Sequence, residues 1–155
     1  MIPRLLLSVL LLSPAALAEE AAKECECLWE GPFTEVQAVT DLVISGEVEQ
    51  VRGNAVDLQV DSVLRGSNYL DSIRVWMKTA HYCRPEAERF KPGTRWVMAL
   101  DRIDKNVPGG FNPNTPNVSY GRIGDYQLSA CGGYFLSRTE DVITCLLYTS
   151  DAADE

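Results

Sequence analysis

The residues best suited to covalent chemistry are cysteines, and two of them, Cys25 and Cys27, are separated by Glu26 alone. Cysteines this close in sequence cannot easily bond to each other, because the intervening chain is too short for relaxed disulfide geometry. We therefore expect each of them to reach a distant cysteine. Two such bonds would hold the Cys25-Glu26-Cys27 segment against two remote parts of the fold.

Cys83 and Cys131 are the available distant partners once Cys145 is set aside with the C-terminal segment discussed below. The four cysteines that remain are an even number, which in an exported chain indicates disulfides. Two pairings fit the sequence. In the first, Cys25 bonds to Cys83 and Cys27 to Cys131. In the second, Cys25 bonds to Cys131 and Cys27 to Cys83. The residues alone leave both pairings open.

The sequence disfavours a metal site and a catalytic cysteine. Zinc sites usually use C-x₂-C pairs or nearby histidines, whereas this chain contains one histidine, His81. A Cys83 held in a disulfide has no thiolate to offer. The sequence also lacks a G-x-S-x-G motif, a phosphate-cradling loop and an H-E-x-x-H motif. We therefore expect a protein that is not an enzyme, with no catalytic residues, no cofactor and no metal ion of its own.

Residues 1–18 have the organisation of a signal peptide. Arg4 supplies a charged region, Leu5 to Leu12 an apolar region, and Ala16-Leu17-Ala18 a small-x-small cleavage site before Glu19. The apolar run is too short to cross a bilayer. We therefore predict a chain that is secreted or periplasmic, cleaved between Ala18 and Glu19, and without a membrane span.

Residues 145–155 read Cys-Leu-Leu-Tyr-Thr-Ser-Asp-Ala-Ala-Asp-Glu and resemble a translated sequencing-library adapter. We interpret this segment as an artefact and exclude it, with Cys145, from reasoning about the fold. The remaining residues 19–144 suit one domain that can bury a real core. We expect this domain to be incomplete at its C-terminal end.

The chain is acidic, with 22 Asp and Glu against 14 Lys and Arg and a formal net charge of −8. Nucleic acids and anionic membrane surfaces attract basic proteins, because binding neutralises their phosphates. The charge balance therefore argues against either as the main partner. Ordinary solubility accounts for it.

Alternating apolar and polar residues predict strands at 41–51, 56–64, 72–78, 94–103 and 120–130. Gly53-Asn54 is typical of a turn between the first two strands, which would be antiparallel. A helical turn is expected within 83–90, a surface loop at 104–118, and a helix from the capping box at 137–140. The fold class is therefore all-β with minor helix, and five short antiparallel strands indicate a small barrel or sandwich.

Two tryptophans are candidates for contact or anchoring roles. In the strand at 72–78, Trp76 shares a face with Arg74 and Lys78, opposite an apolar face. We therefore predict that Trp76 points outward and contacts a partner. Trp29 and Phe33 lie in a connector broken by Gly31-Pro32, where we expect them to pack as anchors.

Several motifs follow one another in a characteristic order: Cys25-Glu26-Cys27, Thr40-Asp41-Leu42-Val43-Ile44, Cys83, and Phe90-Lys91-Pro92-Gly93-Thr94-Arg95-Trp96. This order resembles the netrin-like family, whose best-known members are the tissue inhibitors of metalloproteinases (TIMPs). The resemblance covers most of residues 25–131. It implies an OB-type five-stranded barrel with a closing C-terminal helix that is truncated here. It also implies the pairing Cys25–Cys83 with Cys27–Cys131.

In the TIMPs, the first cysteine is the mature N-terminus, and its amine and carbonyl groups chelate the catalytic zinc of the protease. By position, Cys25 corresponds to that chelator and Glu26 to the residue that enters the protease's apolar pocket. Cleavage after Ala18 leaves residues 19–24 ahead of Cys25, so this mechanism requires further trimming. A Glu26 carboxylate in an apolar pocket also costs free energy unless it is paired or protonated.

We therefore predict an exported netrin/TIMP-like binding module that acts by protein–protein contacts at Cys25, Glu26 and Cys27, with Trp76 as a further contact. The partner would be an unidentified protein. The first alternative is a metalloproteinase inhibitor, whose partner is a zinc metalloproteinase bound through a trimmed Cys25. The second alternative is a structural envelope domain.

Overall fold

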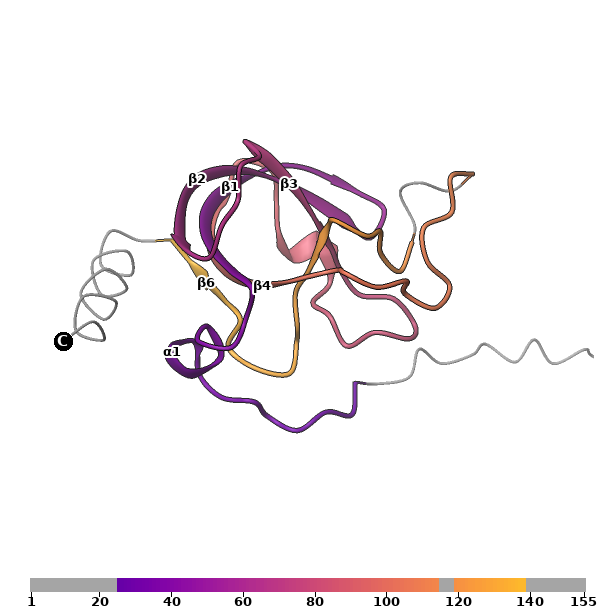
Figure 1. The fold of residues 1–155 in the computed structure, drawn as a ribbon, viewed down its shortest axis with the longest axis horizontal. Coiled ribbons are helices and arrows are strands. Elements are labelled where there is room, and N and C mark those ends of the chain that lie inside the picture. Colours follow the sequence, from indigo (N-terminus) through magenta and orange to yellow (C-terminus); the bar gives the residue numbers. More distant parts are fainter. Residues whose placement is uncertain (1–24, 115–118, 139–155) are drawn as a thin grey trace, which may run out of the picture.

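The computed structural model describes residues 25–114 and 119–138. The predicted signal peptide, C-terminal helix and adapter-like tail lie outside these residues. No helix in the described part of the chain is long and apolar enough to cross a membrane. The strands are β1 (Leu42–Arg52), β2 (Ala55–Arg65), β3 (Ser72–Trp76), β4 (Arg95–Arg102), β5 (Tyr126–Gln127) and β6 (Phe135–Ser137), with helix α1 (Phe33–Val36) and the 3₁₀ turn η1 (Ala87–Arg89) (Figure 1).

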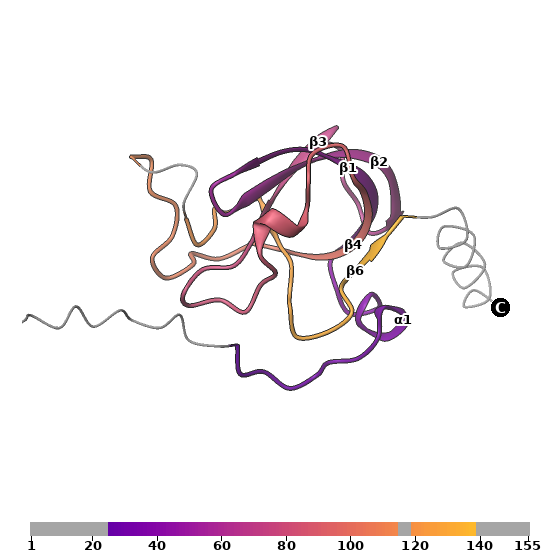
Figure 2. The ribbon, with the colours of Figure 1, turned by 180° about the vertical axis from the view of Figure 1, so that it is seen from behind.

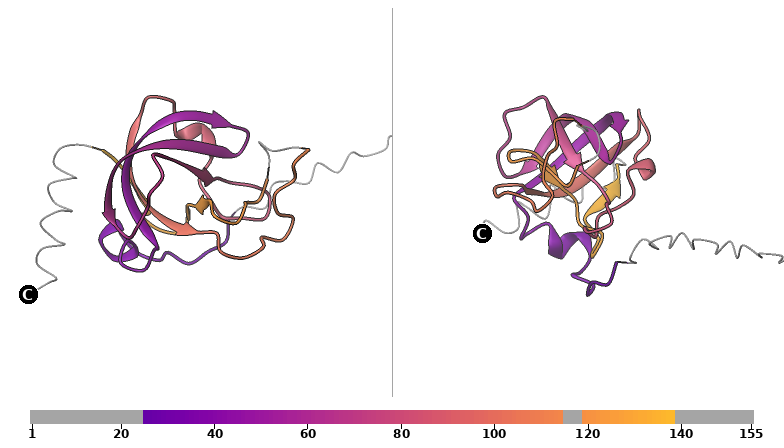
Figure 3. Two further views of the ribbon diagram at one scale, coloured as in Figure 1. Left: turned by 45° about the horizontal axis from the view of Figure 1, so that its top comes forward. Right: turned by 90° about the vertical axis from the view of Figure 1, so that its right-hand side faces the viewer.

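The strands close into a five-stranded barrel, which confirms the predicted fold class (Figure 3). Around the ring, β1 pairs with β2, β2 with β3, β3 with β5, β5 with β4, and β4 with β1, while β6 adds to β4. The β3–β5 pair is parallel, so the prediction that all strands are antiparallel was wrong. A parallel pair needs a crossover connection, and here the chain passes through η1 and β4 between β3 and β5.

The long hairpin of β1 and β2 bends around the barrel. The predicted turn at Gly53-Asn54 joins its strands, and Gly53 has a φ of 56°, which glycine adopts without steric cost. On its other edge, β1 pairs with β4 over residues 42–47. The register with β2 shifts three times, for example between Ser45 and Gly46. Such bulges bend a strand, which lets β1 take part in two sides of the barrel.

Apolar side chains fill the barrel, and α1 closes one of its ends. Phe33 and Val36 of α1 belong to the same buried cluster as the strand residues, and α1 lies beside β6 at that end (Figure 2). β4 is buried on both faces from Val97 to Leu100, as its unbroken apolar run predicted. The strand and loop residues of the cluster include Leu42, Ile44, Val48, Leu58, Val75, Met77, Phe90, Met98 and Leu128.

Three elements differ from the sequence-based expectation. The fifth strand, expected over 120–130, is limited to Tyr126–Gln127, whereas α1 and β6 were not predicted. The helical turn expected within 83–90 is present as η1. β6 is held by pairing with β4, and the backbone N–H of Ala99 donates to the carbonyl of Tyr134 at 2.8 Å. Such contacts join segments far apart in sequence, so a local residue pattern does not reveal them.

Candidate functional site

The segment that carries the Cys-x-Cys motif runs along the surface below the barrel (Figure 1). We call residues 25–30 the N-terminal ridge. All of them are exposed, and none lies in a helix or strand. The side chains of Leu28 and Trp29 are 89% and 69% exposed. The expectation that Trp29 packs as an anchor was therefore wrong, while Phe33 takes that role in α1.

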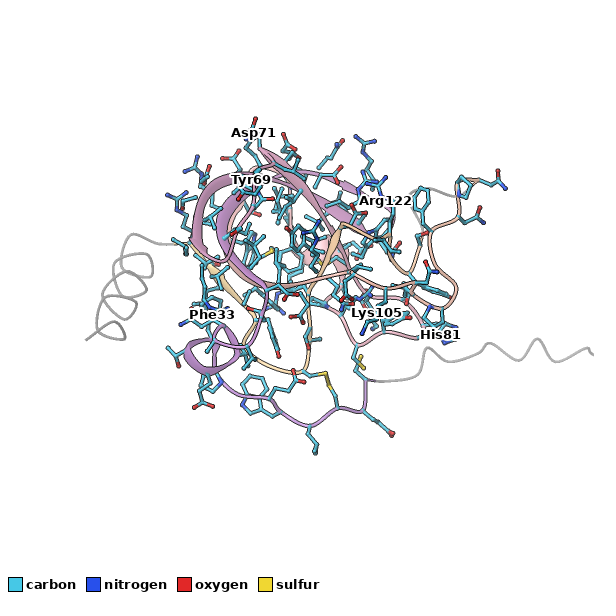
Figure 4. All side chains as sticks on the ribbon, viewed as in Figure 1. Phe33, Tyr69, Asp71, His81, Lys105 and Arg122 are labelled. Carbon is cyan, nitrogen blue, oxygen red and sulfur yellow. A yellow bond between two sulfur atoms is a disulfide. The ribbon has the colours of Figure 1, made fainter. Side chains whose placement is uncertain are left out.

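A disulfide between Cys27 and Cys131 fixes the ridge to the barrel (Figure 4). It joins positions 104 residues apart and belongs to the first of the two pairings that the sequence left open. Beside it, the backbone N–H of Glu30 donates to the carbonyl of Cys131 at 2.8 Å, and that of Gly133 to the carbonyl of Gly31 at 2.9 Å. The ridge is thus held at its base by one covalent bond and two backbone hydrogen bonds.

Cys25 and Cys83 are next to each other, yet both carry free thiols. Hydrogen bonding with Cys83 raises the pKa of the Cys25 thiol, and burial adds to this effect. The structure therefore lacks the second disulfide, Cys25–Cys83, that the family resemblance implied. It brings the two residues into contact without the bond, and a Cys25–Cys83 disulfide remains a prediction.

The four cysteines in the described part of the chain form one group, which we call the cysteine corner: Cys25, Cys27, Cys83 and Cys131. The sulfur atoms of Cys27, Cys83 and Cys131 all lie within 4.8 Å of one another. Three thiolates at such distances can ligate a soft metal ion. Here the disulfide engages two of the three sulfurs, so the group would need reduction before it could hold a metal in that way.

Two cavities open on either side of Cys83. The first, of about 210 Å³, is lined by Cys25, Glu26 and residues 79–83. It includes His81, whose exposed ring packs edge-on against Tyr120 at 5.4 Å (Figure 4). The second, of about 220 Å³, shares Tyr82 and Cys83 with the first. The cysteine corner is therefore accessible to small molecules.

The second cavity contains a buried arginine. The guanidinium of Arg84 donates to the carbonyl of Tyr120 and to Oε1 of Gln127, both at 2.7 Å, and lies 4.4 Å from the ring centre of Tyr82. Burial lowers the pKa of Arg84 to about 10. No ion pair to Arg84 occurs among the described residues. Its hydrogen bonds tie the segment after Cys83 to the strand β5.

Glu30, Asp101 and Tyr134 also form part of the wall of that cavity. The Tyr134 hydroxyl donates to Oε2 of Glu30 at 2.7 Å. Burial and this bond raise the pKa of Tyr134. Burial, together with the charges of Asp41 and Glu30, also raises the pKa of Asp101. This wall therefore disfavours further negative charge at the base of the ridge.

Trp76 is not a contact residue, and the prediction that it points to solvent was wrong. It is fully buried, and its indole Nε1–H donates to Oδ2 of Asp125 at 2.9 Å. Leu28 is an exposed apolar residue that the sequence analysis did not single out, and Trp29 is one that it expected to be an anchor. The signal for them was present, because both follow the Cys-x-Cys motif directly and precede the Gly31-Pro32 break, outside any alternating strand pattern.

A larger cavity of about 400 Å³ lies away from the ridge, between β3 and the segment before β5. Its charged groups are paired with each other. Arg74 Nε lies 2.7 Å from Oδ1 of Asp57, and Arg122 Nη2 lies 3.0 Å from Oδ1 of Asp125. Because these charged groups are already paired with one another, they are less available to a ligand. The ridge is therefore the stronger candidate site.

Comparison of the chain with protein-family models and with curated protein sequences found no match.

Proposed function

We propose that this protein is an exported binding module that contacts a partner protein through its N-terminal ridge. The observation that carries the proposal is the exposure of Leu28 and Trp29, at 89% and 69%, on a segment bonded to the barrel by Cys27–Cys131. Leu28 and Trp29 are neighbours, and contiguous exposed apolar patches are typical of interaction surfaces. A segment that is already held in place also loses less conformational entropy on binding.

The netrin-like character of the module is part of this proposal. It is supported by the closed five-stranded barrel, by the Cys27–Cys131 bond and by the contact between Cys25 and Cys83. An OB-type barrel is a five-stranded Greek-key barrel, and the order β1-β2-β3-β5-β4 agrees with that type. Export to a secreted or periplasmic location is supported by the signal-like residues 1–18 and by the disulfide.

The test compares the exposed pair Leu28 and Trp29 of the ridge with one exposed control residue, Tyr69. A photo-reactive residue at position 28 would first capture the partner in the native exported fraction. Binding of the identified partner is then measured for wild type, for the double variant Leu28→Ser/Trp29→Ser, and for Tyr69→Ser. Tyr69 is 96% exposed and lies on the opposite side of the barrel from the ridge (Figure 4), so it serves as the matched control.

We expect the ridge variant to weaken binding by at least about tenfold. Truncating a central aromatic contact typically costs about 2 kcal/mol or more of binding free energy. The Tyr69→Ser control should bind like wild type. Equal affinities for the ridge variant and wild type would remove the ridge as the binding surface. Loss of binding in the control alone would place the contact on the β2–β3 side.

The alternative function, inhibition of a zinc metalloproteinase, is favoured by one observation. Cys25 is exposed at the tip of the ridge, and Glu26 beside it is also exposed. A chain that begins at Cys25 would present a free amine and carbonyl there. Inhibition of zinc metalloproteinases by a chain starting at Cys25, but not by one starting at Glu19, would support this mechanism over a general binding module. If neither form binds a protein, the structural envelope domain is the remaining proposal.

A further inference from the structure

Cys83 lies between the other three members of the cysteine corner. Its sulfur is within 4.8 Å of both sulfurs of the Cys27–Cys131 disulfide, and it lines one cavity together with Cys25. Thiol–disulfide exchange needs a thiolate that can attack a disulfide sulfur. The structure places a free thiol and an intact disulfide together, so no large movement of the chain is required to bring the reactants into contact.

We propose that Cys83 exchanges with the Cys27–Cys131 disulfide, so that the cysteine corner converts between two disulfide forms. The Cys83 thiolate attacks the sulfur of Cys27. The Cys83–Cys27 bond forms as the Cys27–Cys131 bond breaks, and Cys131 leaves as a thiolate that takes up the proton lost by Cys83. One disulfide and two thiols are present before and after, so the step consumes no oxidant or reductant.

Cys27 is the sulfur that Cys83 attacks, because the ridge can follow the new bond. Cys27 is exposed and lies outside any helix or strand. Cys131 is held more firmly, since its backbone N–H donates to Oγ of Ser129 at 3.1 Å and it is less exposed than Cys27. The new bond would thus move the ridge and leave the loop at Cys131 in place.

Charged groups surround the attacking thiol. The pKa of the Cys25 thiol is raised by hydrogen bonding with Cys83 and by burial. Lys78 brings a positive charge to both thiols, and Glu86, 2.6 Å from Lys78, brings a negative one. The cavity of about 210 Å³ that Cys25 and Cys83 line admits small thiol reagents.

The exchange connects the two pairings that the sequence left open. Before it, oxidation of the free thiols gives Cys25–Cys83 with Cys27–Cys131. After it, oxidation gives Cys25–Cys131 with Cys27–Cys83. Cys27 stays bonded in both forms, but its anchor moves from the loop at Cys131 to the loop at Cys83. The position of the ridge therefore depends on which form is present, and a second disulfide locks that form by removing the attacking thiol.

The first experiment follows exchange in the folded chain. Cys25→Ser/Cys145→Ser leaves Cys83 as the one free thiol, beside the Cys27–Cys131 disulfide. The protein is held without oxygen at pH 8, quenched with acid, alkylated with N-ethylmaleimide and mapped by mass spectrometry without reduction. We expect alkylated Cys131 to appear and to reach a constant share above about 1% of molecules, as for a populated minor state. Alkylation at Cys83 alone, at every time, would overturn the proposal, and alkylation at Cys27 would overturn the assigned direction.

The second experiment measures each disulfide in a variant that can form only that one, so it does not depend on detecting a minor form. In a Cys145→Ser background, Cys25→Ser/Cys131→Ser leaves only Cys27 and Cys83, and Cys25→Ser/Cys83→Ser leaves only Cys27 and Cys131. Both are equilibrated in glutathione buffers and checked for the native fold by circular dichroism. We expect the Cys27–Cys83 bond to form in the folded protein, at a ratio of oxidised to reduced glutathione within about 100-fold of the one at which Cys27–Cys131 forms. A factor of about 100 in stability between the two bonds corresponds to a minor form at about 1% of molecules. A folded protein that keeps Cys27 and Cys83 reduced, or a bond that forms only with loss of the fold, would contradict the exchange.

Discussion

The indole N–H of Trp76 donates a hydrogen bond of 2.9 Å to the carboxylate of Asp125, and both residues are buried. Trp76 is the last residue of β3, and Asp125 immediately precedes β5. The carboxylate also pairs with Arg122 at 3.0 Å. This bond therefore fastens the only parallel strand pair in the described part of the chain, where the barrel closes.

Replacing Trp76 with Phe should lower the free energy of unfolding by about 1–3 kcal/mol, because it removes a donor from a buried carboxylate and leaves a smaller ring. Urea denaturation followed by circular dichroism measures this change. Trp29→Phe is the matched control, since Trp29 is 69% exposed and its replacement should change the free energy by no more than about 0.5 kcal/mol. Equal effects of the two substitutions would show that the Trp76–Asp125 bond contributes nothing.

The sequence correctly predicted the strand that carries Trp76, but it predicted an exposed side chain where the structure has a buried one. Alternation correctly assigns Trp76 to the outside of the barrel. Ile103 and Val107 cover that outside and form a second, smaller core with Trp76 and Ala55. Val107 lies in the segment rich in Pro, Gly and Asn that was expected to be a surface loop. Local pattern does not show what a distant loop covers.

The sequence predicted that the cysteines of the candidate site bond to distant cysteines, but it did not predict that Leu28 and Trp29 are exposed. The spacing of Cys25 and Cys27 excludes a bond between them and requires distant partners, and Cys27 does bond to Cys131. The exposure of Leu28 and Trp29 depends on the path of the chain between Cys27 and α1. An apolar residue before a turn fits a buried anchor as well as an exposed contact, so only the fold decides.

Asp57 should stabilise the fold at neutral pH. Burial opposes its ionisation, but the hydrogen bonds and charge of Arg74 outweigh burial and lower the pKa of the Asp57 carboxyl below 3.8. A lowered pKa adds stability above the unfolded-state value, which is lost as the pH falls through the folded-state value. Asp57→Asn should therefore destabilise the protein at pH 7 and flatten the loss of stability below about pH 4.

A double-mutant cycle with Arg74→Gln checks the origin of this effect. If the pair acts together, Asp57→Asn should cost much less in the Arg74→Gln background than in wild type. Strictly additive losses, measured by urea denaturation at pH 7, would mean that Arg74 is not the partner that lowers the pKa of Asp57.

Asp101 should have the opposite effect. Burial, followed by the charges of Asp41 and Glu30, raises the pKa of Asp101 above 3.8. The folded protein thus holds this proton more tightly than the unfolded chain, and stability is lost as the pH rises through the folded-state pKa. Asp101→Asn should therefore stabilise the protein at pH 7, and this gain should disappear below about pH 4.

Thermal denaturation across that pH range measures the Asp101 effect, with Asp104→Asn as the exposed control. The control should leave the free energy of unfolding within about 0.5 kcal/mol of wild type. A loss of stability in Asp101→Asn at pH 7 would show that the carboxylate accepts bonds that outweigh its repulsion by Glu30.

Substitutions at Gly66 and Gly93 distinguish the cost of backbone strain from the cost of a steric clash. Both glycines have a positive φ, 85° and 81°. A Cβ atom at Gly93 would meet nothing within 4 Å, whereas one at Gly66 would collide with the carbonyl oxygen of Asp41. Gly93→Ala should therefore cost only the left-handed strain, about 1–2 kcal/mol. Gly66→Ala should cost roughly 1–3 kcal/mol more, since the start of β1 must shift. Equal losses in urea denaturation would mean that the chain after β2 moves away from Asp41 freely, and that β1 does not depend on this close approach.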